Sequence, residues 1–558
     1  MVGCGGGGGG GGGGGSGFGA APATVTTLAP VDLAPLGSVA INGKVTFDFV
    51  PVLVTGGVPK LDYASITAKP ARSIGVSLID GVSGAELATA KTDATGNYSF
   101  TGPVGRALFV RAYARLLPVN ALTTARVSVL DNTNNDAQWA LDGAVFTVAN
   151  STALTKNLNA GSGWTGTAYN DSQRIAATFA MLDTIYIGMQ KIIAVDSIAS
   201  FPKLDVHWSP NNVPASGPLG NGGGQIGTSF FTAASTGSVV TSRDLYILGK
   251  ANNDTDEYDQ HVVAHEFGHY LQSAFSRNDS IGGSHGGTND RLDMRVAFAE
   301  GWGNGWSGYS LGNPIYSDTA GAGQANGGTF DVSLGEASNK GWFKESSVER
   351  IIWDLSNNTS IGFSQVWSAL KTGFASSPAL TSAHSFANAL RLSLPAGAAQ
   401  TALTTIFSSE SIAVPTDAYG AGETNFGSPA IARINPIYTT YGALNSTTNV
   451  CVSNDADTAG VGNKAGQHRY IKLNLAASGN RTITVASDAA TQAALISTDP
   501  DFTLYFATGQ GVRRETDAAN TETVTGTLPA GEYVIALTDF KFRTSTTLRA
   551  PCFNVTVN

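Results

Sequence analysis

The string His265-Glu266-Phe267-Gly268-His269 constrains this chain more than any other feature. Two histidines four residues apart project from one face of a helix, so both imidazoles can reach one ion. The chain has seven histidines and 42 acidic residues, so chance gives such a string an expected count on the order of 0.007. The same helix carries an apolar stripe, formed by Val263, Phe267, Tyr270 and Ala274. We therefore expect a buried helix that holds two metal ligands.

Zinc suits this pair of histidines. It accepts imidazole nitrogen, and in catalytic sites it leaves one position open for water. Glu266 directly follows the first histidine, where its carboxylate can take a proton from water and pass it to a leaving amine. We therefore expect His265 and His269 as zinc ligands and Glu266 as the general base.

A third ligand is needed, and three residues compete for this role. Glu300 lies in the apolar run Val296 to Trp302, where a carboxylate is costly to bury unless its charge is compensated. His285 has good ligand chemistry but lies in a glycine loop. A histidine there could contact a substrate, and a solvent-exposed histidine is at least as expected. Asp293 precedes the helical run and could be its cap. We predict Glu300, because a helix holds a ligand more rigidly than a loop.

The HExxH string and the later Glu300-Gly301-Trp302 string resemble the gluzincin metallopeptidases, in particular the fungalysin branch related to thermolysin. The resemblance implies a catalytic domain with zinc ligands His265, His269 and Glu300. Those families place an aspartate where this chain has Asn304, whose side-chain oxygen could still accept from an imidazole N–H. They also use a downstream histidine or tyrosine to stabilise the oxyanion. The residues that could replace it here are His285, Tyr309, Tyr316, Arg350 and His384.

Sequence patterns typical of β-strands flank the central region. The segment from Thr92 to Phe100, with its glycine turn and Tyr-x-Phe strand, resembles the transthyretin-like or carboxypeptidase-regulatory β-sandwich. The last segment, with a Pro-Ala-Gly turn before the strand at 532–537, resembles the pre-peptidase C-terminal domain. Cys451 and Cys552 bracket that segment, which suits a disulfide in an oxidising compartment.

The expected fold class is therefore a multidomain chain: a transthyretin-like β-sandwich, an α+β gluzincin-like catalytic domain and a C-terminal β-sandwich. The expected boundaries place a glycine-rich tether at 1–24, the first sandwich at 25–164, the metallopeptidase domain at 165–445 and the last sandwich at 446–558. A helix near 173–193 is expected to be buried or amphipathic, because charged residues interrupt its apolar stretch.

The beginning of the chain resembles the end of a bacterial lipoprotein signal. Cys4 follows Val2-Gly3 and precedes an unbroken glycine run. Such a run cannot fold, and we interpret it as a flexible tether. The resemblance implies a lipid on Cys4; an ordinary cysteine in a flexible tail is the alternative. We expect an extracytoplasmic protein, anchored at the bacterial cell surface or outer membrane, or secreted, that meets a membrane only through this lipid.

The composition excludes some partners. The net charge is −9 and no basic block is visible, so nucleic-acid binding is not expected. The acidic turn Asn252 to Asp256 could bind Ca²⁺, but it lacks the spacing of a recognised loop, and we expect a solvated turn instead. The expected function is hydrolysis of peptide bonds in a protein or peptide substrate. Two alternatives remain: a zinc hydrolase of a non-peptide amide or ester, and a surface adhesion protein with a structural metal site.

Overall fold

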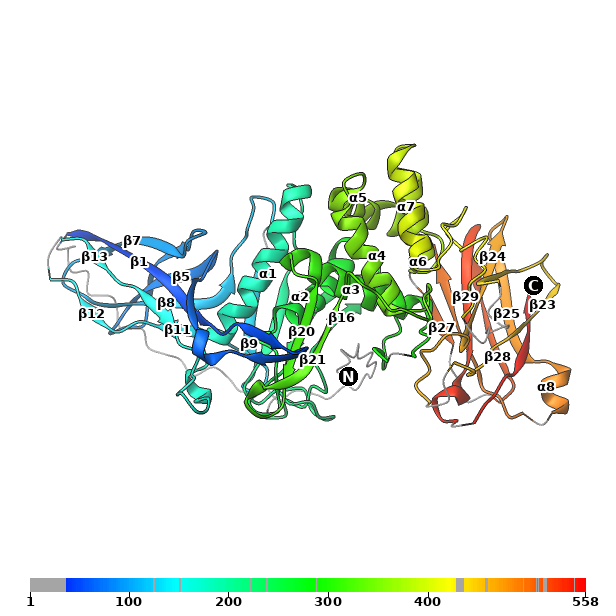
Figure 1. Ribbon diagram of the computed structural model, residues 1–558, viewed down its shortest axis with the longest axis horizontal. Helices are drawn as coiled ribbons and strands as arrows, with labels where there is room; N and C mark the ends of the chain where they lie inside the picture. Colours follow the sequence, from blue (N-terminus) through cyan, green and yellow to red (C-terminus); the bar gives the residue numbers. More distant parts are fainter. Residues whose placement is uncertain are drawn as a thin grey trace.

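The computed structural model describes residues 37–558, except 124–125, 150–151, 221, 237–238, 288, 428–435, 457–459, 495, 508, 510, 515–518 and 546. The tether at 1–24 and Cys4 lie outside the described residues. The chain runs along the long axis of the molecule, from β-sheets through a helical middle to a second β-rich end (Figure 1). It is thus a multidomain, β-rich protein with several sheets and a set of helices.

The N-terminal end is built from two sheets that share one apolar core. The first sheet comprises β1 (Ser38–Phe49), β4 (Thr67–Pro70), β7 (Asn97–Pro103), β13 (Leu154–Thr155) and β14 (Leu158–Ala160). The second contains β5 (Ile74–Asp80), β6 (Glu86–Lys91), β8 (Ala107–Leu116) and β9 (Val127–Asp131), with the short β10 (Ala137–Gln138), β11 (Ala140–Asp142) and β12 (Phe146–Thr147). Buried residues alternate along β7 and β8, as expected for strands with one face on a core.

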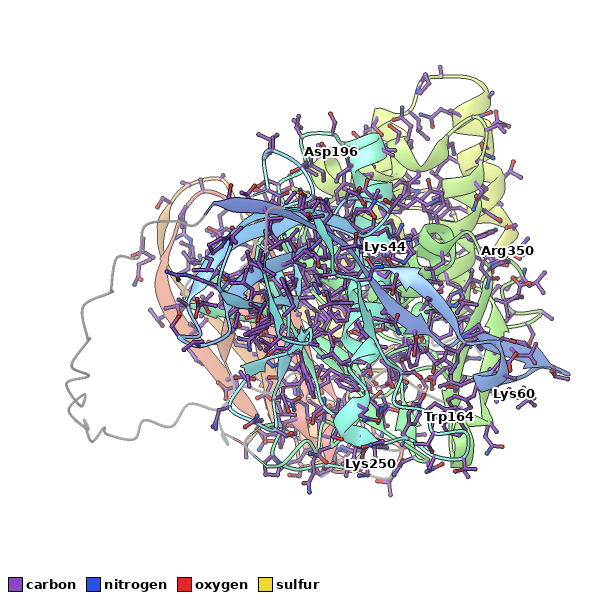
Figure 2. All side chains as sticks on the ribbon, turned by 90° about the vertical axis from the view of Figure 1, so that its left-hand side faces the viewer. Lys44, Lys60, Trp164, Asp196, Lys250 and Arg350 are labelled. Atoms are coloured by element: carbon purple, nitrogen blue, oxygen red, sulfur yellow. A yellow bond between two sulfur atoms is a disulfide. The ribbon has the colours of Figure 1, made fainter. Side chains whose placement is uncertain are left out.

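A hairpin connects this end to the helical middle. Strands β2 (Val52–Thr55) and β3 (Val58–Leu61) pair in antiparallel fashion, and Lys60 of β3 lies at the edge of the molecule (Figure 2). The turn contacts β21 (Asn326–Asp331), where the Thr329 hydroxyl donates to the Gly57 carbonyl.

The second sheet continues beyond residue 164. Strand β9 pairs in parallel with β15 (Leu204–Trp208), which pairs with β17 (Val239–Ile247), and β16 (Phe230–Thr236) forms the edge. The ten-stranded sheet therefore crosses the expected boundary between 164 and 165. Sequence periodicity identifies each strand but not its distant partner, and this explains why the sheet could not be anticipated.

The helices gather in the middle of the molecule (Figure 1). They are α1 (Ala176–Val195), α2 (Gln260–Phe275), α3 (Met294–Leu311), α4 (Glu345–Asn357), α5 (Gly362–Ala369), α6 (Ala383–Ser393) and α7 (Ala398–Ser409), with a π-helical turn at Leu370–Phe374. Of the described helices, α1 has the length and apolar composition of a membrane span, but 67% of that stretch is buried inside the protein. It packs against α2, β1 and β8, so it is a core helix here.

Helices α2 and α3 approach closely at two glycines. A Cβ on Gly303 would lie 2.7 Å from the His265 ring, and one on Gly268 would lie 3.2 Å from the Gly303 backbone. Trp302 donates from its indole to the Gly268 carbonyl. A glycine inside a helix costs about 0.5–1 kcal/mol relative to alanine, and here it allows the two helices to bring their polar side chains together.

The C-terminal end is a β-sandwich with its own apolar core. One sheet has the order β22-β24-β29-β26-β27, formed by Tyr438–Thr440, His468–Leu475, Gly531–Asp539, Pro500–Phe506 and Gly511–Arg514. The other has the order β23-β30-β25-β28, formed by Thr447–Cys451, Cys552–Val557, Gly479–Ser487 and Thr521–Leu528. A short helix, α8 (Ala489–Ala493), follows β25.

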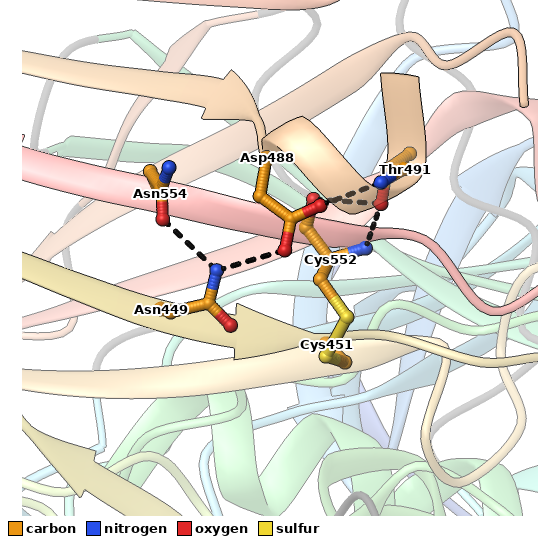
Figure 3. The surroundings of a disulfide bond; sticks show 6 residues. All are labelled: Asn449, Cys451, Asp488, Thr491, Cys552 and Asn554. Atoms are coloured by element: carbon orange, nitrogen blue, oxygen red, sulfur yellow. Dashed lines mark hydrogen bonds between the residues drawn. A yellow bond between two sulfur atoms is a disulfide. The ribbon is translucent and has the colours of Figure 1, made fainter. Parts of the chain in front are cut away.

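The predicted disulfide is present in this sandwich. Cys451 and Cys552 are opposite each other on β23 and β30 and are bonded. Figure 3 shows the bond beside the Asp488–Thr491 turn, where the Thr491 hydroxyl accepts from the Cys552 amide. The bond joins two neighbouring strands of one sheet, which are the first and the last of that sheet in chain order.

Removal of this bond should destabilise the C-terminal sandwich. The cysteines are 101 residues apart, and in the chain-entropy model such a closure contributes about 4–5 kcal/mol. We expect the double variant Cys451→Ser/Cys552→Ser to lower the melting temperature of this sandwich in calorimetry. A transition that does not move would show that the bond constrains little.

Candidate metal centre

Helix α2 presents the two histidines of the HExxH string toward one point. His265 and His269 are buried, and their Nε2 atoms lie 3.1 Å apart. Helical spacing places both rings on the same face of α2. Two imidazole nitrogens that meet in this way can supply two of the ligands of a metal ion.

Glu300 reaches the same point from α3. Its Oε2 lies 3.3 Å from His265 Nε2 and 3.2 Å from His269 Nε2. A tetrahedral zinc ion with ligands at 2.0–2.1 Å separates those ligands from one another by about 3.3–3.4 Å. The three observed separations therefore match the edges of a zinc coordination shell, and two nitrogens with one carboxylate oxygen are a donor set that zinc accepts.

The surrounding imidazoles keep Glu300 ionised. Burial alone would raise the pKa of this carboxyl, but His285, His269 and His265 hold it well below its ordinary value. In turn, although burial lowers the pKa of His269, the charge of Glu300 raises it to about 9. The three groups thus attract one another strongly, as expected of side chains arranged around a shared charge.

Glu266 is buried beside the histidines. A carboxylate oxygen of Glu266 lies within 4.8 Å of ligand atoms of His265 and His269. Burial raises the pKa of Glu266, although the two histidines partly oppose this shift. A carboxylate whose pKa is raised toward neutrality is a better proton acceptor, which is the property required of a general base.

Asn304 orients His265 in the way that the sequence suggested. Its Oδ1 lies 2.7 Å from His265 Nδ1, while its Nδ2 donates to Glu345 at 2.6 Å and to Glu349 at 3.1 Å. Since the amide NH₂ faces carboxylates, the oxygen faces the imidazole, so Nδ1 carries the proton and Nε2 is left for a metal. Sequence reasoning missed the role of Glu345 and Glu349, because α4 follows Asn304 by some forty residues.

This arrangement replaces the aspartate that the resemblance implies. Glu345 and Glu349 on α4 accept from the neutral amide of Asn304, and Glu345 supplies the charge. Burial, reinforced by the nearby charge of Glu345, raises the pKa of Glu349 well above its ordinary value. An aspartate at position 304 would therefore place a further negative charge beside two acidic side chains, which gives a physical reason for the amide.

Asn304→Ala should weaken zinc binding without removing a ligand. Loss of a group that orients a metal-bound histidine typically reduces metal affinity about 10–100-fold. A competition titration with a chromophoric zinc chelator measures this change. Asn357→Ala, at the exposed end of α4, is the matched control, and equal affinity in the two variants would show that Asn304 does not orient His265.

His285 is part of this centre and not a solvent-exposed loop residue. It is buried, its Nδ1 lies 2.9 Å from Glu345 Oε2 and its Nε2 lies 3.6 Å from Glu300 Oε2. Within the described part of the chain, this Nε2 has no hydrogen-bond partner. Although burial lowers the pKa of His285, Glu300 and Glu345 raise it to about 9. Of the two possibilities that the sequence left open for His285, the solvent-exposed loop histidine is wrong, because Glu345 on α4 holds the ring in a buried position.

The remaining candidates for oxyanion stabilisation, and Asp293 as a candidate ligand, lie in different environments. Tyr316 on β20 (Ile315–Ala320) is buried, and its ring centroid lies 6.4 Å from that of His265. Tyr309 stacks on Phe363, Arg350 pairs with Asp354 and Glu410, and His384 pairs with Glu423. Asp293 caps α3 by accepting from the Arg295 amide, which is the role that the sequence allowed.

Two cavities meet the centre. One, of about 490 Å³, is lined by His265, His285 and Tyr316. The other, of about 1060 Å³, is lined by His269 and Glu300, by residues of the edge strand β16, and by residues of the C-terminal sandwich. The candidate ligands are thus buried but border two cavities.

Comparison with known proteins gives little further information. No family model and no curated protein matches the sequence. Among solved structures, the pre-peptidase C-terminal domain of a collagenase from Bacillus anthracis has 11% identity, covers 22% of this chain and 94% of that chain, and has a TM-score of 0.16. A putative carbohydrate-binding protein from Pseudomonas aeruginosa has 14% identity over 23% of this chain and 92% of that chain, with a TM-score of 0.14. TM-scores this low do not support an assignment of fold or function. The gluzincin-like fold of the central region therefore stays a prediction.

Proposed function

We propose that this protein is a zinc-dependent endopeptidase that acts outside the cytoplasm. The observation that carries the proposal is the convergence of His265, His269 and Glu300 at mutual distances of 3.1–3.3 Å, with Glu266 beside them. A structural zinc site closes all four positions with protein ligands, whereas a hydrolytic site has three ligands and a nearby carboxylate. The second description fits these four residues.

The residues would share the reaction as follows. His265, His269 and Glu300 would hold zinc, which acts as a Lewis acid and lowers the pKa of water. Glu266 would accept a proton from the attacking water and donate it to the leaving amine. His285 Nε2, which has no partner, would donate a hydrogen bond to the oxygen that becomes negative as the carbonyl is attacked.

A peptide substrate is favoured over an ester by the edge strand. Strand β16 has a neighbour on one side only, β17, among the described strands of its sheet. Phe231, Thr232 and Ala233 of β16 line the same cavity as His269 and Glu300. An extended peptide can pair with a free strand edge through backbone hydrogen bonds, which an isolated ester cannot reproduce.

The disulfide supports an extracytoplasmic location. A bond between Cys451 and Cys552 forms and persists in oxidising compartments, which supports secretion or attachment at the cell surface. The lipid anchor on Cys4 is also part of the proposal. It rests on the sequence alone, because Cys4 lies outside the described residues.

The proposal is tested by comparing hydrolysis of an unbiased peptide library with hydrolysis of short ester substrates. We expect cleavage in the interior of peptides, with preference at positions that flank the scissile bond on both sides, detected by mass spectrometry. Efficient ester hydrolysis with intact peptides would favour the non-peptide hydrolase instead.

A further inference from the structure

A second group of buried acids lies close to the start of α2, apart from the metal centre described above. Carboxylate oxygens of Asp254, Asp256 and Asp318 lie within 4.8 Å of one another. Asp254 belongs to β19 (Asp254–Thr255) and Asp318 to β20, which are neighbours in a four-stranded sheet with β18 (Gly249–Lys250) and β21. Asp256 and Asp318 are only 3% and 6% exposed. The turn that ends in Asp256 is therefore solvated only at Asn252 and Asn253, and its carboxylate end is buried, which the sequence did not predict.

Asp259 adds a fourth carboxylate. It is the residue before the first turn of α2 and is fully buried. Its Oδ2 accepts from the amide and the hydroxyl of Thr319, which follows Asp318 on β20, at 2.8 and 2.9 Å. The charges of Asp318 and Asp254 act on it directly, so Asp259 faces the same cluster.

Several oxygens in this place have no donor. Among the described residues, Asp254, Asp256, Asp259 and Asp318 each keep one buried Oδ1 without a hydrogen-bond partner. Gln324, which is 0% exposed, donates from Nε2 to the Thr319 carbonyl and leaves its Oε1 unpartnered as well. Buried acceptors without donors are rare in folded proteins, and four unpartnered carboxylate oxygens in one cluster, with that of Gln324 beside Thr319, point to a positive partner that the described residues do not supply.

The neighbouring Glu257 shows how this chain compensates a buried acid. It is paired with Arg174 at 2.5 Å, and both side chains are buried. None of the ion pairs in the described part of the chain involves the four aspartates. Burial, reinforced by the charge of Glu257, raises the pKa of Asp254 to about 6, and burial, reinforced by the charge of Asp254, raises the pKa of Asp318 to about 8, so without a cation these groups would need protons.

We propose that Asp254, Asp256, Asp259 and Asp318 bind a calcium ion that ties the start of α2 to β20. The ligand atoms are all oxygens, which suits a hard cation, and calcium accepts six to eight of them in flexible geometry. Zinc is disfavoured, because the cluster offers neither imidazole nor thiolate. Gln324 Oε1 and backbone carbonyls can supply the remaining ligands.

Calcium at this position would stabilise the helix that carries the metal centre. Asp259 lies directly before α2, and helix α2 contacts β20. The first turn of α2 leads to His265 without an intervening loop. Loss of calcium should therefore loosen the N-terminal end of α2 before it affects the distant sandwiches.

Thermal unfolding tests this proposal independently of peptidase activity. The protein is stripped of all metals, zinc is restored to a fixed saturating level, and Ca²⁺ is then titrated. We expect a saturable rise in melting temperature of about 5 °C or more at calcium well above its dissociation constant. Asp256→Asn and Asp318→Asn should lose this response, whereas Asp455→Asn, at an exposed acidic turn, should keep it.

Calorimetric titration of the wild-type protein with Ca²⁺ gives a second readout in case a variant does not fold. One binding event per chain supports the site. No heat and no change in melting temperature would contradict it and leave the aspartates neutralised by protons. An equal or larger stabilisation by Mg²⁺ would contradict the assignment to calcium.

Discussion

Glu266→Gln is expected to retain zinc and lose nearly all turnover. Glutamine keeps the size of the side chain but cannot accept a proton, and positioned general bases typically contribute about 10²–10⁴-fold to the rate. The three proposed ligands are unchanged, so the metal content should remain one zinc per chain. Turnover is measured on the peptides found in the library, and zinc by elemental analysis of the same sample.

A matched variant isolates the role of this carboxylate. Glu86→Gln makes the same chemical change at an exposed position on β6 and should leave kcat unaltered. Unchanged cleavage by Glu266→Gln, with zinc present, would sink the assignment of the base.

Glu300→Ala is expected to lose most of the bound zinc while the fold persists. Loss of a residue that only orients a ligand already costs about 10–100-fold in affinity, so loss of the ligand itself should exceed about 100-fold. Removal of the carboxylate also leaves His265 and His269 without the charge that compensates them. Zinc content after gel filtration and far-ultraviolet circular dichroism measure the two parts of this prediction.

His285→Ala separates two roles for the nearby imidazole. If His285 donates to the oxyanion, the variant should retain zinc and lose about 10²–10³-fold in kcat. If the variant loses zinc as Glu300→Ala does, His285 is a fourth protein ligand, the site is closed, and its role is structural. That second result would contradict the proposed hydrolysis, so this pair of variants is a sharp test.

The sequence was informative where local spacing determines structure. The positions of His265, Glu266 and His269 on one helix follow from the period of the helix alone. Glu300 could be selected because a lone carboxylate in an apolar run requires compensation. The disulfide between Cys451 and Cys552 was predicted because these two cysteines bracket the C-terminal segment of an extracytoplasmic protein, and the structure contains it.

The sequence was less informative where distant segments meet. Glu345 fixes His285 and Asn304 from another helix, and no local pattern marks that contact. The parallel pairing of β9 with β15 joins regions that composition separates. Asp318 completes an acidic cluster some sixty residues after Asp256, so the turn alone looked solvated. Each of these depends on tertiary packing, to which periodicity is blind.

Restoration of activity by zinc tests the central claim most directly. The protein is stripped of metal, and cleavage of a peptide from the library is followed as zinc is added at fixed calcium. We predict no cleavage before addition, and recovery that is complete at one equivalent of zinc per chain and absent in Glu300→Ala. Cleavage that persists without zinc, or that never appears although one zinc is bound, would contradict a zinc-dependent peptidase.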